Sequence, residues 1–290
     1  MKISVNGILC DENEAVVSVY DHGFLYGIGL FETFRTYKGR PFLLKEHLDR
    51  LMGGCRELGI DFEAAPGQVE QTILALLNAN RLTDAYIRYT VSAGRQPLGL
   101  PSGDYDQPSV IVYMKELPSY HADLYEVGKP LQRLRIRRNT PEGTVRLKSI
   151  HYMNNILAKR ELLTYPWAQE AEGLFLTESA HLAEGIVSNL FYMNKGMGYT
   201  PAVSTGILPG VTRAFVLKLA AQAGMEVVEG HYEWQDLLDA DEIFLTNSIQ
   251  GLVPVCRLFD EQGASWQVGD GQAGVHTRQL MELYRQAARN

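Results

Sequence analysis

The chain has 290 residues, of which 46% are hydrophobic and 21% are charged, with a formal net charge of −7 and an isoelectric point near 5.6. This composition is typical of a globular protein and excludes a disordered or fibrous chain. The acidic balance argues against a nucleic-acid-binding protein, which usually presents a basic face.

Signals that would direct the chain to a membrane or to an oxidising compartment are not found in the sequence. The segment MKISVNGILCDENEA becomes acidic early and has no long apolar core, which argues against a signal peptide. The apolar stretches are too short to span a bilayer. Cys10, Cys55 and Cys256 are odd in number and widely spaced, so neither a disulfide framework nor a zinc site is predicted. We therefore expect a cytoplasmic protein without a bound metal.

In the first part of the chain, turn signals and periodic segments predict both strands and helices. Asn6-Gly7, between short apolar runs, is a strong signal for a two-residue hairpin, and Lys38-Gly39 is similar. Leucines at helical spacing predict a helix over about 43–58, which ends at Gly59. The other elements predicted here are a helix over about 66–80 and strands over 85–94 and 109–114.

The stretch around residues 116–130 has two prolines and little periodicity, which predicts an interdomain linker over 119–130. The linker divides the chain into a small N-terminal α/β domain, 1–118, and a larger C-terminal α/β domain, 131–290. The helices predicted in the second domain cover about 152–165, 209–224 and the last twenty residues. The predicted strands cover 131–136, 173–178, 189–194, a stretch near 198–200, 242–247 and 252–258. The predicted fold class is therefore α/β (α+β) with two domains.

Two segments contain side chains that could take part in catalysis, a lysine in the first and a glutamate in the second. Lys148, in VRLKSIHYMNN, has apolar residues on both sides and precedes a predicted helix. A lysine nucleophile needs a partly neutral amine, which burial or a nearby cation favours. Glu184, in LAEGIVSNLF, precedes a tight turn and an apolar strand. If each residue is considered singly, the ordinary interpretation of Lys148 is a solvated lysine, and that of Glu184 is a glutamate in a surface loop.

Two later segments offer groups that bind anions. TGILPGVTR opens a predicted helix, where backbone N–H groups and the positive helix end favour an anion, and Thr212 adds a hydroxyl. LTNSIQG ends a predicted strand with hydroxyl and amide side chains. An amine, a carboxylate and an anion-binding helix start, in this order, are what pyridoxal phosphate requires for its aldehyde, its pyridine nitrogen and its phosphate.

With these motifs the chain resembles the fold-type IV pyridoxal-phosphate enzymes, over nearly its whole length. That family includes branched-chain aminotransferases, D-amino acid aminotransferases and aminodeoxychorismate lyases. The resemblance implies that Lys148, which is followed by Tyr152-Met153-Asn154-Asn155, binds the cofactor covalently. It also implies that Glu184, which is followed by Asn189-Leu190-Phe191, faces the pyridine nitrogen.

The same resemblance implies how the phosphate is held. The turn at 208–213 matches the family's phosphate turn, and the H-x-x-R-L motif at 47–51 makes Arg50 the phosphate arginine. Ser248 is the hydroxyl that precedes the Val-Pro-Val strand. The implied cofactor contacts are Arg50, Lys148, Tyr152, Glu184, Leu208, Gly210, Val211, Thr212 and Ser248.

Within the family, three segments look most like the bacterial lyases, namely DHGFLYGIGLFETFRTY, RRNTPEGTVRLKSIHYMNN and EIFLTNSIQGLVPV. Thr33 stands where branched-chain aminotransferases usually have glycine, and the run between Lys148 and its tyrosine is one residue shorter than in those enzymes. The D-amino acid enzymes use an Arg-x-His pair on one strand, whereas Arg88 is followed here by Tyr89 and Thr90.

The resemblance therefore implies a homodimeric lyase of folate biosynthesis, which converts 4-amino-4-deoxychorismate to 4-aminobenzoate and pyruvate. Lys148 would remove the C4 proton, and Thr33 or Lys148 would protonate the leaving group. The expected substrate contacts are Tyr26, Arg35 and Arg88, and no nucleic acid or membrane partner is expected. One alternative is an aminotransferase of the same fold, acting on branched-chain or D-amino acids. A non-catalytic protein is disfavoured, because both the lysine and the glutamate are present.

Overall fold

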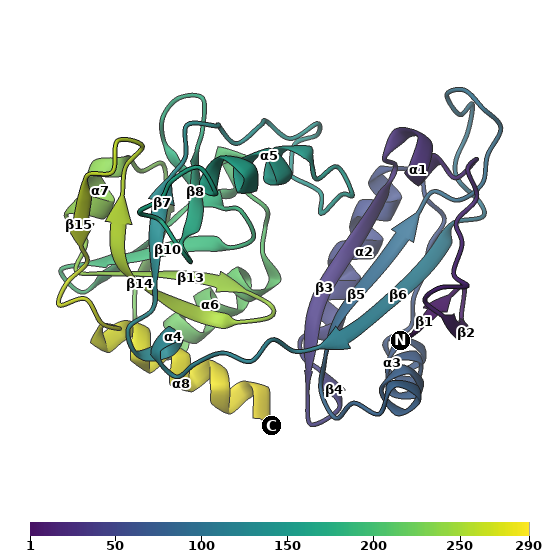
Figure 1. Ribbon diagram of the computed structural model, residues 1–290, viewed down its shortest axis with the longest axis horizontal. Helices are drawn as coiled ribbons and strands as arrows, with labels where there is room; N and C mark the ends of the chain where they lie inside the picture. The colour runs from purple at the N-terminus through teal and green to yellow at the C-terminus, as the bar shows by residue number, and fades with distance from the viewer. Residues whose placement is uncertain (290) are drawn as a thin grey trace. The chain divides into compact units, whose positions relative to one another are not determined.

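The computed structural model describes residues 1–289, and the chain divides into two compact units. The first unit comprises Met1–Pro118 and Leu147–His151, and the second comprises Ser119–Arg146 and Tyr152–Ala288. Each unit contains a β-sheet and helices (Figure 1), in agreement with the predicted mixture of elements.

The first unit is built on a six-stranded sheet in the order β2-β1-β6-β5-β3-β4. Its strands are β1 Lys2–Val5, β2 Ile8–Asp11, β3 Gly29–Tyr37, β4 Arg40–Pro41, β5 Ala85–Ser92 and β6 Ser109–Glu116. Strands β3 and β5 pair antiparallel along most of their length, with Thr33 opposite Arg88. Since side chains alternate between the two faces of a strand, Phe31, Thr33 and Arg35 share one face of β3.

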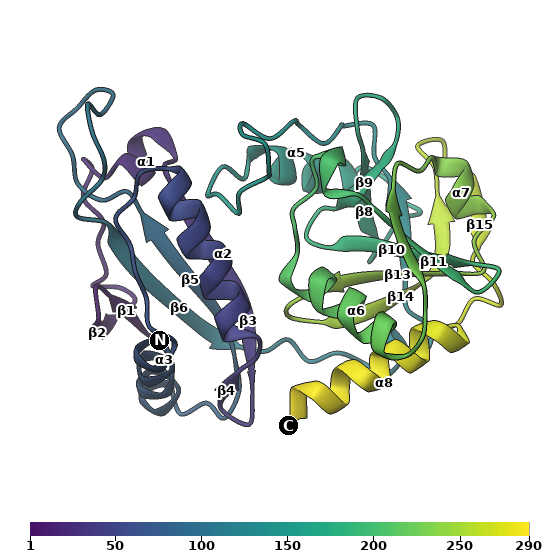
Figure 2. The same cartoon turned by 180° about the vertical axis from the view of Figure 1, so that it is seen from behind.

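Helices pack on the other face of this sheet, and together they form one hydrophobic core (Figure 2). The helices of the unit are α1 His22–Tyr26, α2 Leu44–Glu57 and α3 Pro66–Asn80, of which α2 and α3 contribute side chains to this core. Leu48 and Leu51 of α2 are buried with Phe34 of β3, which explains the leucine spacing in the sequence. The chain leaves α2 through Gly59, whose φ of 64° is the left-handed value expected at this position.

The predicted two-residue turns have the backbone geometry that tight hairpins need. Asn6 and Gly7 have φ values of 50° and 81°, and Lys38 and Gly39 have values of 51° and 77°. Positive φ at both central residues is the feature of the type I′ turn, which matches the twist of the flanking strands. The pair Lys195-Gly196 has the same geometry, with φ values of 52° and 80°, and was not predicted.

The second unit is built on a nine-stranded sheet in the order β12-β11-β10-β13-β14-β7-β8-β9, with β15 beside β14. The strands are β7 Lys129–Arg133, β8 Glu172–Leu176, β9 Leu182–Gly185, β10 Asn189–Asn194, β11 Met197–Pro201, β12 Val227–Gly230, β13 Glu242–Asn247, β14 Gly251–Phe259 and β15 Ser265–Gln267. The helices are α4 Asp123–Glu126, α5 Met153–Leu162, α6 Val211–Gln222, α7 Trp234–Leu238 and α8 Val275–Arg289.

Two hydrophobic clusters cover this second sheet. Leu174 belongs to the cluster that includes Leu237 of α7, whereas the adjacent Phe175 belongs to the cluster that includes Ala158 of α5. Neighbouring residues of a strand point to opposite faces, so the two clusters lie on opposite sides of β8. The unit is therefore layered, with apolar packing on both faces of its sheet.

Two stretches differ from the expectations drawn from the sequence. Residues 119–130, predicted as a linker, contain α4 and the start of β7. The stretch Leu147–His151, predicted within the second domain, groups with the first unit because it pairs with β3. The Phe31 amide donates to the Lys148 backbone oxygen at 2.9 Å, and the Ile150 amide donates to that of Gly29 at 3.1 Å. So short a segment has no periodicity by which sequence analysis can recognise it.

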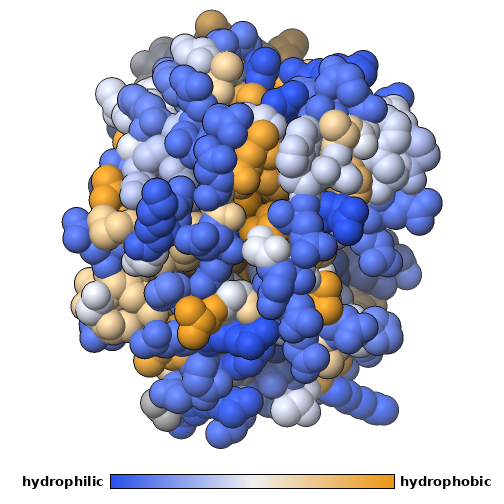
Figure 3. Space-filling view, turned by 90° about the vertical axis from the view of Figure 1, so that its left-hand side faces the viewer, coloured by the Kyte–Doolittle hydropathy of each residue, from blue (hydrophilic) through white to orange (hydrophobic). Residues whose placement is uncertain are grey.

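Hydrophilic side chains predominate on the face of the molecule seen in Figure 3, where hydrophobic ones form only small groups. This distribution agrees with the burial of most large apolar side chains in the core clusters. Within residues 1–289, no helix combines the length and the apolar character needed to cross a membrane.

Candidate active site

Lys148 lies in the short segment that pairs with β3 of the first unit. Its backbone oxygen accepts the amide hydrogen of Phe31, and the adjacent Ser149 forms a β-bridge with Leu30. The Lys148 amine lies 4.7 Å from the centre of the Phe31 ring, and the residue is only partly exposed. The backbone bonds therefore fix Lys148 against the sheet, and its amine contacts an aromatic face.

The Phe31 ring gathers further predicted residues on the same face of the sheet. The guanidinium carbon of Arg88 lies 3.5 Å from the centre of this ring. Thr33 follows Phe31 on that face of β3 and is paired directly with Arg88. The structure thus brings together Lys148, Thr33 and Arg88, three of the residues predicted to act on the substrate.

Arg35 lies farther along the same face of β3. Its guanidinium carbon is 4.3 Å from the centre of the Tyr37 ring, two residues beyond it on the strand. Arg35 therefore shares the face of Phe31 and Thr33, but its aromatic neighbour is Tyr37. The aromatic neighbour of Arg88 and Lys148 is Phe31.

Tyr26, the last residue of α1, is close to the segment that carries the lysine. The His151 imidazole lies 3.1 Å, through Nε2, from the Tyr26 backbone oxygen. The Tyr26 hydroxyl accepts the amide hydrogen of Gly99 at 3.0 Å. Tyr26 is thus connected to the residue three positions after Lys148.

Arg50, the predicted phosphate arginine, extends from α2 to a carboxylate on β3. Its Nε and Nη2 atoms donate to the two oxygens of Glu32 at 2.7 and 2.6 Å. His47, one turn earlier on α2, meets the same carboxylate through Nδ1 at 2.6 Å. The histidine and the arginine of the H-x-x-R-L motif therefore converge on Glu32, which the sequence analysis did not single out.

The charge states of this cluster follow from its burial and from the arginine. Burial alone would raise the pKa of Glu32, but the charge of Arg50 and the contacts with His47 lower it to about 2. Burial lowers the pKa of His47 below its usual value, against the opposing effect of Glu32. His47 is therefore a neutral imidazole, and it donates its Nδ1 hydrogen because an ionised carboxylate only accepts.

Glu184 lies on β9 of the second unit and is 5% exposed. Its Oε1 atom accepts from Arg138 Nε at 2.8 Å. Its Oε2 atom accepts from the Leu208 amide at 3.0 Å and from the Asn189 side chain at 3.3 Å. An unpaired buried charge is costly, so these donors explain how the carboxylate is tolerated. The predicted glutamate and the predicted turn residue Leu208 are in direct contact.

Two buried arginines beside Glu184 were missed by the sequence analysis. One is Arg138, described above, and the other is Arg146. The Arg146 Nε atom lies 3.9 Å from Glu184 Oε1 and donates to the Gly206 backbone oxygen at 2.6 Å. Burial, together with the nearby Arg138 charge, lowers the pKa of Arg146 to about 10. Their one signal in the sequence is a concentration of arginines in an aperiodic stretch, which is equally typical of a solvated loop.

Helix α5 holds Arg138 in place. Arg138 Nη1 donates to the side-chain oxygen of Asn154 at 2.7 Å and to that of Asn155 at 3.3 Å. Tyr152, a predicted cofactor contact, is the N-cap residue of this helix. The Tyr-Met-Asn-Asn run that follows the lysine therefore anchors the arginine that pairs with Glu184.

The predicted phosphate turn leads into α6, whose first residue is Val211. Gly210 is its N-cap residue, and no side chain within residues 1–289 caps the helix. Asn189, which also bonds Glu184, donates to the Leu208 backbone oxygen at 2.9 Å. A Cβ atom at Gly210 would collide with the Asn189 side-chain oxygen, so the close approach requires glycine. The helix start presents the N–H groups that anions bind.

Hydroxyl groups gather near this turn. Thr212 Oγ1 lies 3.0 Å from Ser248 Oγ. Thr246 pairs with Asn189 across the sheet, and its buried Oγ1 has no hydrogen-bond partner among the residues that the structure describes. A buried hydroxyl without a partner is unfavourable unless a ligand or water completes it. The hydroxyls, the helix start and the Glu184 carboxylate fit a phosphorylated pyridine such as pyridoxal phosphate.

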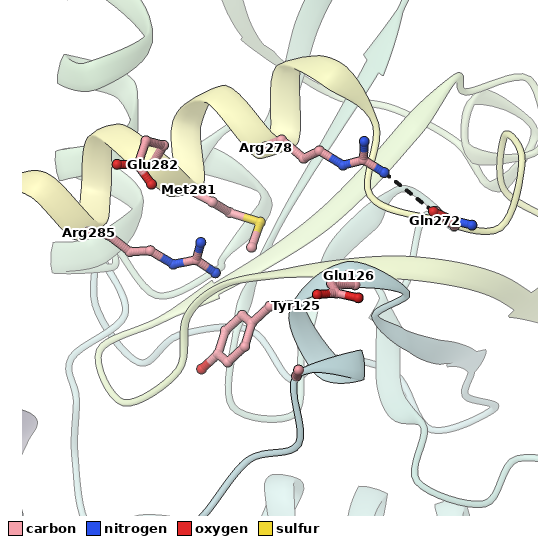
Figure 4. A pocket seen from close by; sticks show the side chains of 8 residues that line it. Tyr125, Glu126, Gln272, Arg278, Met281, Glu282 and Arg285 are labelled. Carbon is pink, nitrogen blue, oxygen red and sulfur yellow. Dashed lines mark hydrogen bonds between the residues drawn. The ribbon is translucent and has the colours of Figure 1, made fainter.

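The second unit also has a surface hollow, between α4 and α8 (Figure 4). Its charged lining residues include Glu126, Arg278, Glu282 and Arg285, so acidic and basic groups are balanced. None of the predicted site residues lines it. In the described part of the chain, no group of three or more metal-ligating side chains is found.

Sequence comparisons relate the chain to characterised families over nearly its whole length. The profile of the amino-transferase class IV family matches residues 29–258. The aminodeoxychorismate lyase of Bacillus subtilis (strain 168) is 42% identical over 290 residues, covering 99% of this chain and 95% of that protein. A putative branched-chain-amino-acid aminotransferase of Methanocaldococcus jannaschii is 36% identical over 287 residues, covering 98% of this chain and 96% of that protein.

Solved structures of both kinds of enzyme have a similar fold. A putative 4-amino-4-deoxychorismate lyase of Legionella pneumophila has a TM-score of 0.82 and 27% identity, covering 96% of this chain and 97% of that chain. The T.th. branched-chain amino acid aminotransferase, complexed with N-(5'-phosphopyridoxyl)-L-glutamate, has a TM-score of 0.84 and 30% identity, covering 99% of this chain and 94% of that chain. Both similarities extend over nearly complete chains.

Proposed function

Because the chain belongs to the amino-transferase class IV family, we propose that it is a pyridoxal-phosphate lyase that converts 4-amino-4-deoxychorismate to 4-aminobenzoate and pyruvate. The family membership confirms the predicted fold-type IV class. The observation that carries the proposal is the 42% identity with the Bacillus subtilis lyase, which extends over 99% of the chain. The product 4-aminobenzoate assigns the reaction to folate biosynthesis.

Pyridoxal 5′-phosphate is the cofactor of this proposal. When bound, it supplies an aldehyde that captures the substrate amine and a ring that takes up negative charge. We assign its covalent attachment to Lys148 and the contact with its ring nitrogen to Glu184. The hydrogen bonds that orient the Glu184 carboxylate, from Arg138 and Leu208, support this role.

The phosphate is assigned to the start of α6 and its surroundings. The uncapped helix end and the neighbouring hydroxyls of Thr212 and Ser248 support this assignment. The other residues of the proposed cofactor site are Arg50, Tyr152, Leu208, Gly210 and Val211.

The elimination needs one base and one acid. The Lys148 amine removes the proton from C4 of the substrate, and the Thr33 hydroxyl, or Lys148 with its captured proton, protonates the departing enolpyruvyl group. One proton leaves the ring and one joins the leaving group, so the reaction consumes neither water nor an oxidant. The arrangement of Lys148, Thr33 and Arg88 about the Phe31 ring supports these roles.

The two carboxylates of the substrate call for cationic partners. We assign this role to Arg88 and Arg35, which share one face of the first sheet, and we assign Tyr26 to the lining of the substrate pocket. Charge-assisted bonds between a guanidinium and a carboxylate are stronger than neutral ones, which favours arginine for this task.

Borohydride reduction tests the cofactor assignment. The purified protein should be yellow, and reduction followed by peptide mapping should locate the cofactor on Lys148. Lys148→Ala should bind the cofactor only non-covalently and lose almost all turnover. A label on another lysine, such as Lys159 of α5, would refute the assignment.

A second candidate function is transamination, which the 36% identity with the Methanocaldococcus jannaschii protein favours. Transamination consumes an α-keto acid, whereas elimination does not. The two are separated by assaying branched-chain L-amino acids and D-alanine with a keto acid beside 4-amino-4-deoxychorismate without one. Turnover of the amino acids with no release of 4-aminobenzoate would favour the aminotransferase.

We further infer that the protein acts as a cytoplasmic homodimer. The family resemblance supports the dimer, and exposed apolar side chains of the first unit, such as Phe24 and Leu100, are suited to contact a second copy.

A further inference from the structure

Glu32 is a buried carboxylate that the proposed reaction does not use. It lies on β3 between Phe31 and Thr33 and is fully buried. Because adjacent residues of a strand point to opposite faces, Glu32 points away from the face that carries Phe31 and Thr33. Its carboxylate faces α2, where it meets His47 and Arg50. A direct acid–base role on the substrate is therefore excluded by its orientation.

The bonds of Glu32 fix the orientation of Arg50. One carboxylate oxygen accepts from Arg50 Nε and the other from Arg50 Nη2, which sets the plane of the guanidinium group. His47 Nδ1 holds the carboxylate from a third direction, and the His47 ring packs 5.2 Å from the Phe34 ring. The guanidinium is therefore held at a rigid junction of strand and helix.

The distribution of exposure shows which end of this cluster can reach a ligand. The side chains of Glu32 and His47 are each 1% exposed, whereas that of Arg50 is 18% exposed. The contact with Glu32 uses the Nε and Nη2 edge of the Arg50 guanidinium. A buried ion pair is by itself weak evidence for added stability, which leaves the orientation of Arg50 as the role to test.

We propose that Glu32 is a positioning residue, which holds Arg50 in the orientation that binds the cofactor phosphate while remaining out of contact with the cofactor itself. This rests on the proposed function, in which Arg50 is a phosphate contact. His47 has the supporting role of fixing the carboxylate.

The test compares two ligands that differ only in the phosphate. Full-length protein freed of cofactor is titrated with pyridoxal 5′-phosphate and, separately, with pyridoxal, and binding is followed by absorbance. Glu32→Gln keeps the size of the side chain but replaces one accepting oxygen by a donor. A charge-assisted bond lost at the phosphate corresponds to at least about tenfold weaker binding, so Glu32→Gln should weaken the phosphorylated ligand by this factor. The affinity for pyridoxal should be unchanged.

Glu261→Gln is the matched control. Glu261 Oε2 accepts from both Arg133 Nε and Arg133 Nη2, at 2.8 and 2.6 Å, so this glutamate–arginine pair of the second unit uses the same two donor atoms but only one carboxylate oxygen. This control should change neither affinity. Arg50→Gln and the double variant Glu32→Gln/Arg50→Gln complete the set. In Glu32→Gln the Arg50 guanidinium loses its carboxylate partner, which could impair folding, and the double variant removes that charge.

If Glu32 acts through Arg50, Glu32→Gln should cause no further loss of affinity for pyridoxal 5′-phosphate in the Arg50→Gln protein. Equal weakening of both ligands by Glu32→Gln would overturn the inference, because it would indicate a general structural role. The inference would also be overturned if Glu32→Gln still bound pyridoxal 5′-phosphate more tightly than pyridoxal by the normal factor, while Arg50→Gln did not. In that case Arg50 would remain a phosphate contact. If Arg50→Gln itself keeps full affinity, the proposed role of Arg50 fails and the inference fails with it.

Discussion

Thr33 is the residue whose proposed role separates elimination from transamination most clearly. Elimination must protonate a departing enolpyruvyl group, and transamination has no such leaving group. Loss of a general acid usually slows a reaction by about 10²-fold or more, so Thr33→Ala should slow pyruvate release by that factor. Cofactor binding and any side transamination of D- or L-alanine should be much less affected, as parallel assays of the two reactions would measure.

Thr33→Ser is the control for this prediction, because it keeps the hydroxyl and removes only a methyl group. It should retain most of the lyase activity. Equal losses of both reactions in Thr33→Ala would assign Thr33 to packing in the sheet alone.

At the scale of residues, the sequence identified groups that belong to local motifs and missed groups whose partners are distant in the chain. Lys148 and Glu184 were recognised by the residues that follow them. Arg138 was missed because its partner Glu184 is 46 positions away, and Glu32 was missed because it becomes informative only when Arg50 folds against it. A pairing of this kind leaves no periodic or local pattern in the sequence.

The start of α8 depends on one carboxylate from β13. Glu242 Oε1 accepts from the amide and Nδ1 of His276 at 3.1 and 2.9 Å. Its Oε2 accepts from the amide and hydroxyl of Thr277 at 2.8 and 2.7 Å. Burial alone would raise the pKa of Glu242, but the bonds from Thr277 and His276 lower it below its usual value. The ionised carboxylate thus supplies acceptors for N–H groups at the helix start.

Glu242→Gln should lower the free energy of unfolding by about 1–3 kcal/mol at neutral pH. The folded-state pKa lies below the unfolded one, so the contribution of Glu242 is fully present above the unfolded value of about 4.3 and is lost as the pH falls through the folded value. Urea unfolding of both proteins from pH 7 to pH 3 should show the difference shrinking in acid. A difference that grows as the pH falls would contradict this account.

At the scale of elements, length decided what could be predicted. The helix predicted over 66–80 coincides with α3, because proline suits its first turn and its apolar positions recur through four turns. The helices α1, α4 and α7 were not predicted, since four or five residues are too few to show a period. Their positions depend on tertiary contacts and capping.

At the scale of the molecule, exposed apolar side chains of the first unit support the proposed dimer. Val16 and Phe24 are 81% and 72% exposed, and Leu98 and Leu100 are 73% and 88% exposed. The two segments that carry them are joined by a hydrogen bond of 3.1 Å from the Gln96 amide to the Tyr20 backbone oxygen. Because the two segments are hydrogen-bonded to each other, their exposed apolar side chains offer a candidate contact area, and such areas commonly mark contacts between proteins.

Leu100→Glu should shift the protein from dimer to monomer, because it introduces a charge into this area. Sedimentation velocity across a range of concentrations measures the effect. Val275→Glu, at a side chain of α8 that is 70% exposed, is the matched control and should remain dimeric. A monomeric wild-type protein at every concentration would exclude the dimer.

The family could be predicted from the sequence because its motifs are spread along almost the entire chain. The extents of the two units could not, because Leu147–His151 joins the first unit through backbone bonds with β3. Backbone pairing of this kind depends little on which side chains are present, so the sequence carries no mark of it.

The proposed reaction of the protein is the elimination of pyruvate from 4-amino-4-deoxychorismate. Its most direct test is to incubate the cofactor-loaded protein with this substrate in the absence of any α-keto acid, and to quantify both products over time. We expect 4-aminobenzoate and pyruvate to form in equal amounts until the substrate is consumed, and we expect the Lys148→Ala protein to form neither. Failure of the unmutated, cofactor-loaded protein to release 4-aminobenzoate would contradict the proposed lyase function.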